Sequence, residues 1–176
     1  MNDDLRALVR TIPDFPHPGI MFRDITTLLL DGAGFARTVE RMAEQAGTGF
    51  DLIAGIEARG FVFGAALANR LGAGMVLIRK RNKLPGAVIG VNYALEYGED
   101  RVEIHADAVK PGARVLIVDD LIATGGTALA AAQLLRAAGA IVTRAAFVID
   151  LPALGGAERL RAAGVEVVAL LAFDGE

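Results

Sequence analysis

Two adjacent carboxylates, Asp119 and Asp120, follow an apolar run and precede a short turn rich in glycine and threonine, Ala123-Thr-Gly-Gly-Thr127. An alanine-rich helical pattern comes next. Free N–H groups at the start of a helix bind phosphate, and glycines let the backbone approach it closely. The carboxylates offer acceptors for hydroxyl groups. This combination predicts a site for a sugar phosphate.

A structural interpretation of the same residues remains open. The aspartates could end a strand, and Thr124 or Thr127 could cap the helix that follows. Two carboxylates beside such a turn are costly unless they meet a ligand, which favours the ligand site. The segment is not a Walker A loop, because no Gly-Lys-Ser/Thr follows, and it lacks the Gly-x-Gly-x-x-Gly pattern of dinucleotide-binding folds.

A second candidate anion site is Gly55-Ile-Glu-Ala-Arg-Gly60, at the end of another short apolar run. Arg59 beside Gly60 opens a predicted helix, and a guanidinium group matches the geometry of phosphate. The alternative is an ordinary turn with a surface ion pair.

A third candidate is the basic run Arg79-Lys-Arg-Asn-Lys83, followed by Leu84-Pro-Gly86. Such runs are usually solvated. A nucleic-acid patch is disfavoured by the net charge of -3. Beside a phosphate site, cations on a loop fit a lid that neutralises a leaving group.

The elements that must position these groups alternate between strand and helix. Apolar runs predict strands over 52–56, 75–78, 115–118, 141–149 and 165–173. Helical spacing predicts helices over 34–45, 61–71, 127–138 and 157–163, and residues 88–97 and 101–104 could pair as a hairpin. This alternation predicts an α/β fold with a central parallel sheet and helices on both faces, whose ligands bind at the carboxyl ends of the strands.

Composition narrows the class of protein. The 176 residues suit one domain, 1–176, and 53% of them are hydrophobic. The absence of cysteine excludes thiol chemistry, and the two histidines, His17 and His105, are far apart. The first residues lack the pattern of a signal peptide, and the longest apolar stretch is a poor membrane span. We therefore expect a cytoplasmic protein with neither a membrane nor a nucleic-acid partner.

Residues 115–128 resemble the signature with which type I phosphoribosyltransferases bind phosphoribosyl pyrophosphate (PRPP). The resemblance implies that Asp119 and Asp120 hold the ribose hydroxyls as catalytic residues. It assigns the 5′-phosphate to Ala123, Thr124, Gly125, Gly126 and Thr127. It assigns pyrophosphate to Glu57, Ala58, Arg59, Gly60, Arg79, Lys80 and Lys83, with Arg59 also catalytic. Many relatives have Ser at the position of Ala58, which a backbone contact would tolerate.

Two further segments resemble the adenine-specific members of this family. Leu95-Glu-Tyr-Gly98 implies that Glu96 handles the proton at the purine N7, with Tyr97 in the lid. Pro18-Gly-Ile-Met-Phe-Arg-Asp-Ile25 implies that Phe22 stacks on the purine while the backbone near Met21 and Arg23 binds its edge. Asp24 could instead be structural, either pairing with Arg23 or capping the next helix, and Leu151 could border the base.

The resemblance thus implies a type I phosphoribosyltransferase fold with a small N-terminal hood (residues 1–32) and a flexible lid (residues 79–100). The implied reaction is adenine + PRPP → AMP + pyrophosphate, with Mg²⁺ carried by PRPP rather than by protein ligands. A homodimer is implied, in which Arg79 reaches the neighbouring site. Two rivals remain: an enzyme for hypoxanthine, guanine or xanthine, and a PRPP-sensing regulator. The few residues before Pro13 leave little room for a DNA-binding motif.

Overall fold

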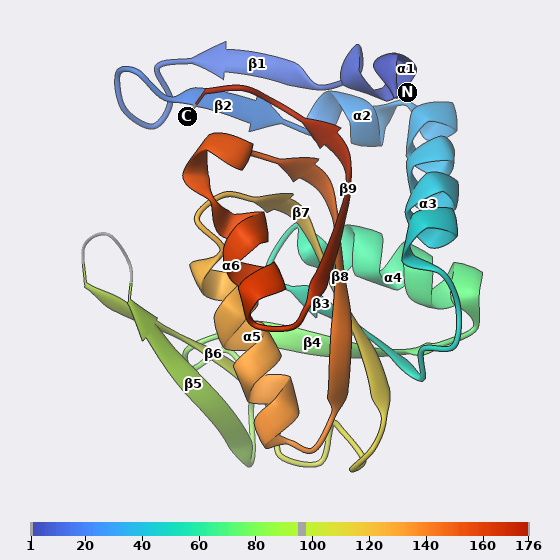
Figure 1. Ribbon diagram of the computed structural model, residues 1–176, viewed down its shortest axis with the longest axis vertical. Coiled ribbons are helices and arrows are strands. Elements are labelled where there is room, and N and C mark those ends of the chain that lie inside the picture. Colours follow the sequence, from blue (N-terminus) through green and yellow to red (C-terminus); the bar gives the residue numbers. More distant parts are fainter. Residues whose placement is uncertain (1, 95–97, 176) are drawn as a thin grey trace.

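The computed structural model describes residues 2–94 and 98–175. Its main feature is a seven-stranded sheet with strand order β5-β6-β4-β3-β7-β8-β9, and β1 and β2 form a separate two-stranded sheet (Figure 1). The strands are β1 (Arg10–Pro13), β2 (Met21–Asp24), β3 (Leu52–Ile56), β4 (Gly74–Lys80), β5 (Val88–Ala94), β6 (Glu99–His105), β7 (Arg114–Ile122), β8 (Ile141–Asp150) and β9 (Glu166–Ala172). The helices are α1 (Asp3–Arg6), α2 (Thr26–Leu30), α3 (Gly32–Ala46), α4 (Gly60–Leu71), α5 (Gly126–Ala137), the 3₁₀ turn η1 (Pro152–Leu154) and α6 (Gly156–Ala162).

Both faces of the large sheet are buried, which is why its central strands are continuous apolar runs. Along β7, Leu116 and Val118 pack in one core cluster with residues of α3 and α4. Val115 and Ile117 belong to a second cluster with residues of α5 and α6. Successive side chains of a strand point to opposite faces, so this alternation places two helices on each side of the sheet. The predicted α/β class is confirmed.

Five neighbouring strands, β4, β3, β7, β8 and β9, run parallel. The predicted hairpin is present as β5 and β6, which join the sheet through antiparallel pairing of β6 with β4. The second strand of this hairpin begins at Glu99, earlier than the expected Arg101. The predicted helix of residues 61–71 ends as expected at Gly72, which adopts the left-handed conformation (φ 65°).

Two expectations for local structure are wrong. Arg79 and Lys80 belong to β4 and not to a loop, because their backbones pair with Glu103 and Val102 of β6. Strand β7 continues through Asp119 and Asp120 to Ile122 and does not end before them, because its pairing with β8 runs on to Asp150.

The N-terminal segment, for which the sequence indicated no strands, contains β1 and β2, paired from Arg10 with Asp24 to Pro13 with Met21. Asp14 stabilises the connection between them, because its Oδ1 accepts a hydrogen bond from the Gly19 N–H at 2.8 Å. Figure 1 shows this hairpin lying across one end of the large sheet, beside the C-terminal end of the chain. Within the described residues, we find no helix that is both long and apolar enough to cross a membrane.

Candidate active site

The sequence motifs meet at the carboxyl edge of the parallel strands. Strand β3 pairs with β7 in the register Leu52–Val115 to Gly55–Val118, so the loop after Ile56 lies beside Asp119. Gly60 makes this approach possible, because an added Cβ would lie 2.7 Å from the Val118 carbonyl oxygen and 2.9 Å from Asp119 Oδ1. The segments of residues 57–60 and 119–127, which are far apart in the sequence, therefore form one surface.

The turn before α5 forms a small cavity of about 130 Å³. Its lining consists of Asp119, Leu121, Ile122, Ala123, Thr124, Gly125, Gly126, Thr127 and Ala128. The residue that caps α5 is Gly125 (φ 78°), and among the described residues no side chain caps the helix. The alternative that Thr124 or Thr127 caps α5 is therefore wrong. In the part of the chain that the structure describes, the first N–H groups of α5 are left without a side-chain acceptor, and groups of this kind bind phosphate at many sites.

A second glycine pair, missed by the sequence interpretation, packs under this turn. The Gly156 N–H donates to the Ala123 carbonyl at 3.0 Å. A Cβ on Gly156 would lie 2.3 Å from the Ala123 oxygen and 2.6 Å from the Gly125 nitrogen. The doubled glycine at 155–156, just before a helical pattern, was the available signal.

Substitution of Gly156 by alanine should therefore displace the turn. The added methyl group meets backbone atoms, which cannot rotate away, and overpacking of this kind costs about 1–3 kcal/mol. We expect a melting temperature lower by several degrees and, if the turn binds the 5′-phosphate, a KM for PRPP raised about tenfold. Gly32→Ala is the matched control, because no atom lies within 4 Å of its added Cβ. Equal KM values for PRPP in the two variants would contradict the role of Gly156.

Asp120 and Arg59 form an ion pair across the two loops. Arg59 Nε lies 2.5 Å from Asp120 Oδ2, and the Asp120 side chain is 6% exposed whereas that of Arg59 is 54% exposed. Burial alone would lower the pKa of Arg59, but the neighbouring charges of Asp120 and Asp119 hold this pKa above its usual value. Burial, and then the neighbouring charge of Asp120, raise the pKa of Asp119 well above its usual range.

The residue at the start of the β3–α4 loop, Glu57, is held by two neighbours on β4. Its Oε2 accepts hydrogen bonds from Arg79 Nε at 3.0 Å and from the Lys80 N–H at 2.8 Å. Burial opposes ionisation, but these two hydrogen bonds keep the pKa of Glu57 below its usual value. The peptide bond between Glu57 and Ala58 is cis. Among the expected pyrophosphate ligands, Ala58 and Arg59 are exposed on this loop.

The other expected cations lie toward the β5–β6 hairpin. Lys80 Nζ lies 2.5 Å from Asp100 Oδ2 and also contacts the Tyr93 hydroxyl, which is 3.2 Å from Thr127 Oγ1. Burial would lower the pKa of Lys80, but the hydrogen bonds to Asp100 and Tyr93 raise it. Lys83 is exposed. Lys80 thus joins the hairpin to the turn before α5 through Tyr93, a link that the sequence did not indicate.

A cavity of about 470 Å³ lies between the N-terminal hairpin and the carboxyl edge of the sheet. Its lining is Ile20, Met21, Phe22, Arg23, Arg59, Leu121, Ala123, Thr124, Leu151 and Leu154. The three residues expected at the base, Met21 to Arg23, are therefore brought together with Leu151 and Ala123. Leu154 was not singled out from the sequence, because only the fold brings η1 to this wall.

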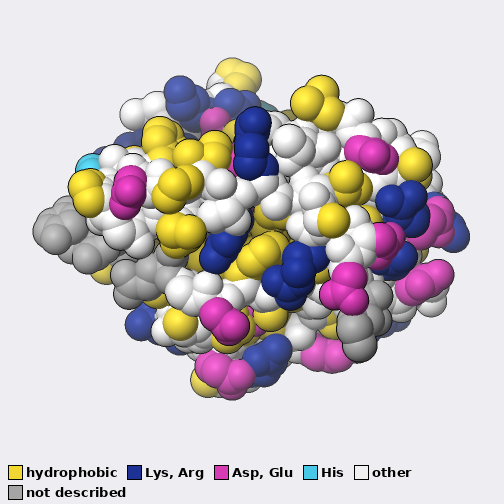
Figure 2. Space-filling model, turned by 90° about the horizontal axis from the view of Figure 1, so that it is seen from above, with side chains coloured by type: hydrophobic (Ala, Val, Ile, Leu, Met, Phe, Trp, Pro, Cys, Tyr) yellow, Lys and Arg dark blue, Asp and Glu magenta, His cyan; other side chains and the backbone are white. Residues whose placement is uncertain are grey.

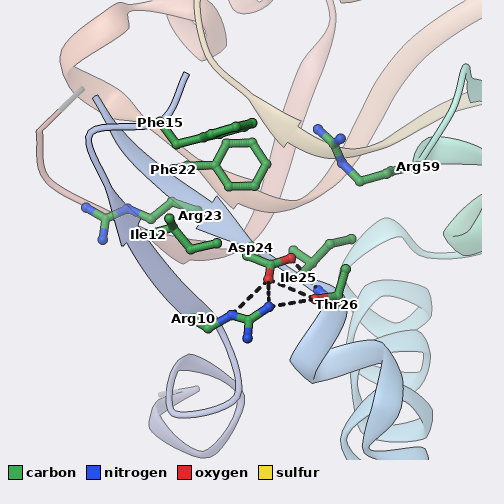
Figure 3. Close-up of a pocket in the computed structure, with 9 residues that line it drawn as sticks. All are labelled: Arg10, Ile12, Phe15, Phe22, Arg23, Asp24, Ile25, Thr26 and Arg59. Atoms are coloured by element: carbon green, nitrogen blue, oxygen red, sulfur yellow. Dashed lines mark hydrogen bonds and ion pairs between the residues drawn. The ribbon is translucent and has the colours of Figure 1, made fainter. Parts of the chain in front are cut away.

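An adjoining cavity of about 400 Å³ shares Phe22, Arg23 and Arg59 with the first. Figure 3 shows that the ring of Phe22 lies under Phe15 and that Arg59 approaches from the opposite side. The two rings meet edge to face with centroids 5.2 Å apart. Phe15 is 52% exposed and was not predicted to take part.

Seen from above the hairpin, Lys/Arg and Asp/Glu side chains are interspersed on the surface (Figure 2).

Asp24 is structural, and its partner is not Arg23. Its carboxylate accepts hydrogen bonds from Arg10 Nε at 3.0 Å and from the Thr26 N–H at 2.9 Å, so it fixes the start of α2 (Figure 3). Arg23 instead donates to Thr11 Oγ1 and to the Asp174 carbonyl. The Thr26 backbone, and then Arg10, lower the pKa of Asp24 to about 2.

This carboxylate should contribute stability that depends on pH. Because the folded pKa lies below the usual value of 3.8, the contribution is present above about pH 4 and is lost as the pH falls toward 2. We expect Asp24→Asn to lower the free energy of unfolding by about 1 kcal/mol at pH 7. Urea unfolding at pH 7 and pH 3 measures this difference, which should shrink at the lower pH. A difference that is the same at both values would contradict the ionic contribution.

The expected residues Glu96 and Tyr97 lie outside the described residues. Their neighbours Ala94 and Glu99 end β5 and begin β6. Near the turn of α5, the Ala94 carbonyl oxygen lies 3.7 Å from the position of a Cβ on Gly126. The described part of the hairpin therefore lies against the turn before α5.

Residues 26–166 match the family of the phosphoribosyl transferase domain. The chain is 62% identical over 174 residues to adenine phosphoribosyltransferase of Novosphingobium aromaticivorans, covering 98% of each chain. Among solved structures, adenine phosphoribosyltransferase from Thermoanaerobacter pseudethanolicus has a TM-score of 0.92 at 48% identity, covering 97% of this chain and 99% of that one. The Saccharomyces cerevisiae enzyme, crystallised with adenine and an imino-altritol bisphosphate, has a TM-score of 0.89 at 37% identity, with 96% and 97% coverage.

Proposed function

Because the chain belongs to the phosphoribosyltransferase family and to its adenine-specific members, we propose that the edge described above is one active site with three subsites. The reaction is adenine + PRPP → AMP + pyrophosphate, a step of purine salvage. The observation that supports the site most strongly is the convergence of Asp119–Asp120, Arg59 and the cavity under Phe22 on the ends of β3 and β7.

PRPP, the donor, would be bound through contacts to its ribose and to its 5′-phosphate. The N–H groups of residues 123–127 would receive the phosphate at the start of α5, where the helix dipole favours negative charge. Asp119 and Asp120 would accept hydrogen bonds from the ribose hydroxyls. The ribose would then compete with Arg59 for Asp120, so donor binding would free the guanidinium group for pyrophosphate.

Pyrophosphate, the leaving group, would be bound mainly by cationic side chains. As the bond between C1′ and pyrophosphate breaks, positive charge grows at C1′ and negative charge on the leaving oxygen. Arg59 and the backbone of residues 57–60 would stabilise pyrophosphate, together with Arg79, Lys80 and Lys83. Asp119 and Asp120 would orient the sugar and balance the charge at C1′, since positioning and electrostatics carry most of the rate in such transfers.

The base would lie in the cavity of about 470 Å³, between Phe22 of the N-terminal hood (residues 1–32) and Leu151. The backbone near Met21 and Arg23 would bind its edge. The N9 of adenine attacks C1′, and Glu96 would exchange the proton at N7. Residues 79–100, which include Tyr97, would act as the lid.

Mg²⁺ fits this site as a companion of PRPP. The described residues contain no group of three or more His, Cys, Asp or Glu side chains that could hold a metal ion, and hard cations bind the oxygens of phosphate and hydroxyl groups readily. The ion would be held by pyrophosphate and the ribose hydroxyls. When bound, it neutralises charge on the leaving group.

We further propose a homodimer located in the cytoplasm, as the family resemblance implies. Arg79 is the residue proposed to reach the neighbouring site, although in the structure it pairs with Glu57 of its own chain. Sedimentation equilibrium tests the dimer, and a monomer at all concentrations would exclude it.

A panel of bases tests the function. Purified protein is mixed with PRPP and Mg²⁺, and kcat/KM is measured for adenine, hypoxanthine, guanine and xanthine. We expect adenine to exceed the others by at least about 100-fold, because fixed backbone groups that pair with the 6-amino edge are left unpaired by a 6-oxo base. Faster turnover of any 6-oxopurine would contradict the proposal.

A further inference from the structure

The residue that follows β9, Phe173, is fixed to one wall of the base cavity by its backbone. Its N–H donates to the Asp150 carbonyl at 3.1 Å, and Asp150 is the last residue of β8. The next residue, Leu151, lines the cavity. Phe173 is buried, with 8% of the residue exposed, and belongs to the same core cluster as Leu151.

The ring of Phe173 is fixed to the opposite wall. The guanidinium carbon of Arg23 lies 4.6 Å from the ring centroid, and that of Arg6 lies 4.5 Å from it, both within the range of cation–π attraction. Arg23 belongs to β2, whose residues Met21 and Phe22 line the cavity. In Figure 3 its side chain points away from Phe22 and Arg59, so the strand faces the cavity while the guanidinium group lies behind it.

Hydrogen bonds also connect the end of the chain with the hairpin and with the start of the chain around α1 (Asp3–Arg6). Arg23 Nη2 donates to the Asp174 carbonyl at 3.1 Å, and Arg6 Nη2 donates to the Ala172 carbonyl at 2.7 Å. Asn2 Nδ2 donates to the Leu170 carbonyl at 2.7 Å. Figure 1 shows the C-terminal end of the chain beside β2.

The hairpin depends on contacts with the rest of the chain to hold its position over the cavity. In the described residues, β1 and β2 pair only with each other and not with the seven-stranded sheet. A two-stranded hairpin is marginally stable alone, so packing against its surroundings must fix its distance from the sheet. The Phe173 ring contacts Arg23 of the hairpin, and the Phe173 N–H is bonded to Asp150, the residue before Leu151. Phe173 therefore connects the hairpin with the wall of the cavity that Leu151 forms.

We propose that Phe173 is a positioning residue for base recognition. It sets the separation between the hood wall, Met21 to Arg23, and the wall formed by Leu151, and thereby the fit of a planar purine. This inference rests on the proposed location of the base in this cavity. The phosphate-binding turn and the pyrophosphate loop are held by other contacts, so their affinities do not depend on Phe173.

The test compares Phe173→Leu with Phe173→Tyr. Leucine keeps an apolar side chain but removes the ring face that the two guanidinium groups contact, whereas tyrosine keeps that face. We expect Phe173→Leu to raise the KM for adenine about fivefold to tenfold, with kcat and the KM for PRPP within about twofold of wild type. Phe173→Tyr should keep the KM for adenine at the wild-type value. The Kd of AMP, measured by calorimetry, should rise in parallel in the leucine variant.

A second variant covers the case in which Phe173→Leu does not fold. Arg6→Met removes one of the two guanidinium groups and leaves the ring buried, so it should raise the KM for adenine about threefold. Arg161→Met is the matched control, because Arg161 Nη2 also contacts a β9 carbonyl, that of Val167 at 3.4 Å, far from the hairpin. It should leave the KM for adenine unchanged.

Two results would overturn the inference: an unchanged KM for adenine in both Phe173→Leu and Arg6→Met, or an equal rise in the KM values for adenine and PRPP. A wild type that binds AMP but makes none from adenine would instead overturn the proposed function. In that case the Kd of AMP still decides the role of Phe173.

Discussion

Asp120→Asn should lower kcat/KM for PRPP about 100-fold, or by roughly 3 kcal/mol, at nearly unchanged melting temperature. The substitution keeps the shape of a side chain that is 6% exposed and removes its charge. An amide binds ribose hydroxyls less strongly than a carboxylate and cannot balance positive charge at C1′. Because Arg59 is 54% exposed, water can solvate its guanidinium group once the ion pair is lost. Steady-state kinetics with varied PRPP measures the effect.

The matched control is Asp107→Asn. Asp107 is an exposed aspartate that lines a cavity with Asp51 and Lys110, at the amino ends of β3 and β7. It should leave kcat/KM unchanged. If Asp120→Asn behaved like this control, the proposed contact between Asp120 and the ribose would be wrong.

Glu96→Gln should lower kcat about 100-fold while the KM for adenine changes less than about threefold, since general acid–base catalysis typically contributes 10²–10⁴. This prediction rests on the resemblance at residues 95–98. Glutamine retains the hydrogen-bonding shape but cannot exchange the proton at N7. Single-turnover measurements with saturating adenine and PRPP isolate the chemical step.

Glu99→Gln is the control, because Glu99 is an exposed glutamate at the start of β6, three residues further along the chain. A change in KM alone for Glu96→Gln would replace proton transfer by a positioning role. Loss of activity in both variants would indicate damage to the hairpin as a whole.

The main sheet could be predicted because its central strands are buried on both faces. Leu52 to Ile56 forms β3 with the predicted bounds, and residues 115–118 of β7 and 145–148 of β8 alternate between two core clusters. The N-terminal hairpin could not be predicted, because β1 and β2 have only four residues each and no hydrophobic side chain in them is fully buried. Arg79 and Lys80 were misplaced because polar strand ends lack an apolar pattern, and only pairing with β6 reveals them.

The candidate site was predictable where its groups are close in sequence. Asp119, Asp120 and the turn of residues 123–127 form one motif, and the pairing of β3 with β7 brings Arg59 to them. Contacts between distant segments were not predictable. The packing of Gly156 under the turn and the contact of Tyr93 with Thr127 depend on how the hairpin and α6 lie against α5.

A crystal structure of the protein with AMP, pyrophosphate and Mg²⁺ tests the central claim most directly, namely that residues 57–60, residues 119–127 and the cavity under Phe22 form one active site. We predict that the AMP phosphate lies on residues 123–127, the ribose hydroxyls at Asp119 and Asp120, the purine between Phe22 and Leu151, and pyrophosphate at Arg59. The Arg59–Asp120 ion pair should be broken in this complex. Binding of the AMP phosphate away from residues 123–127, or of the purine outside the cavity under Phe22, would contradict the account.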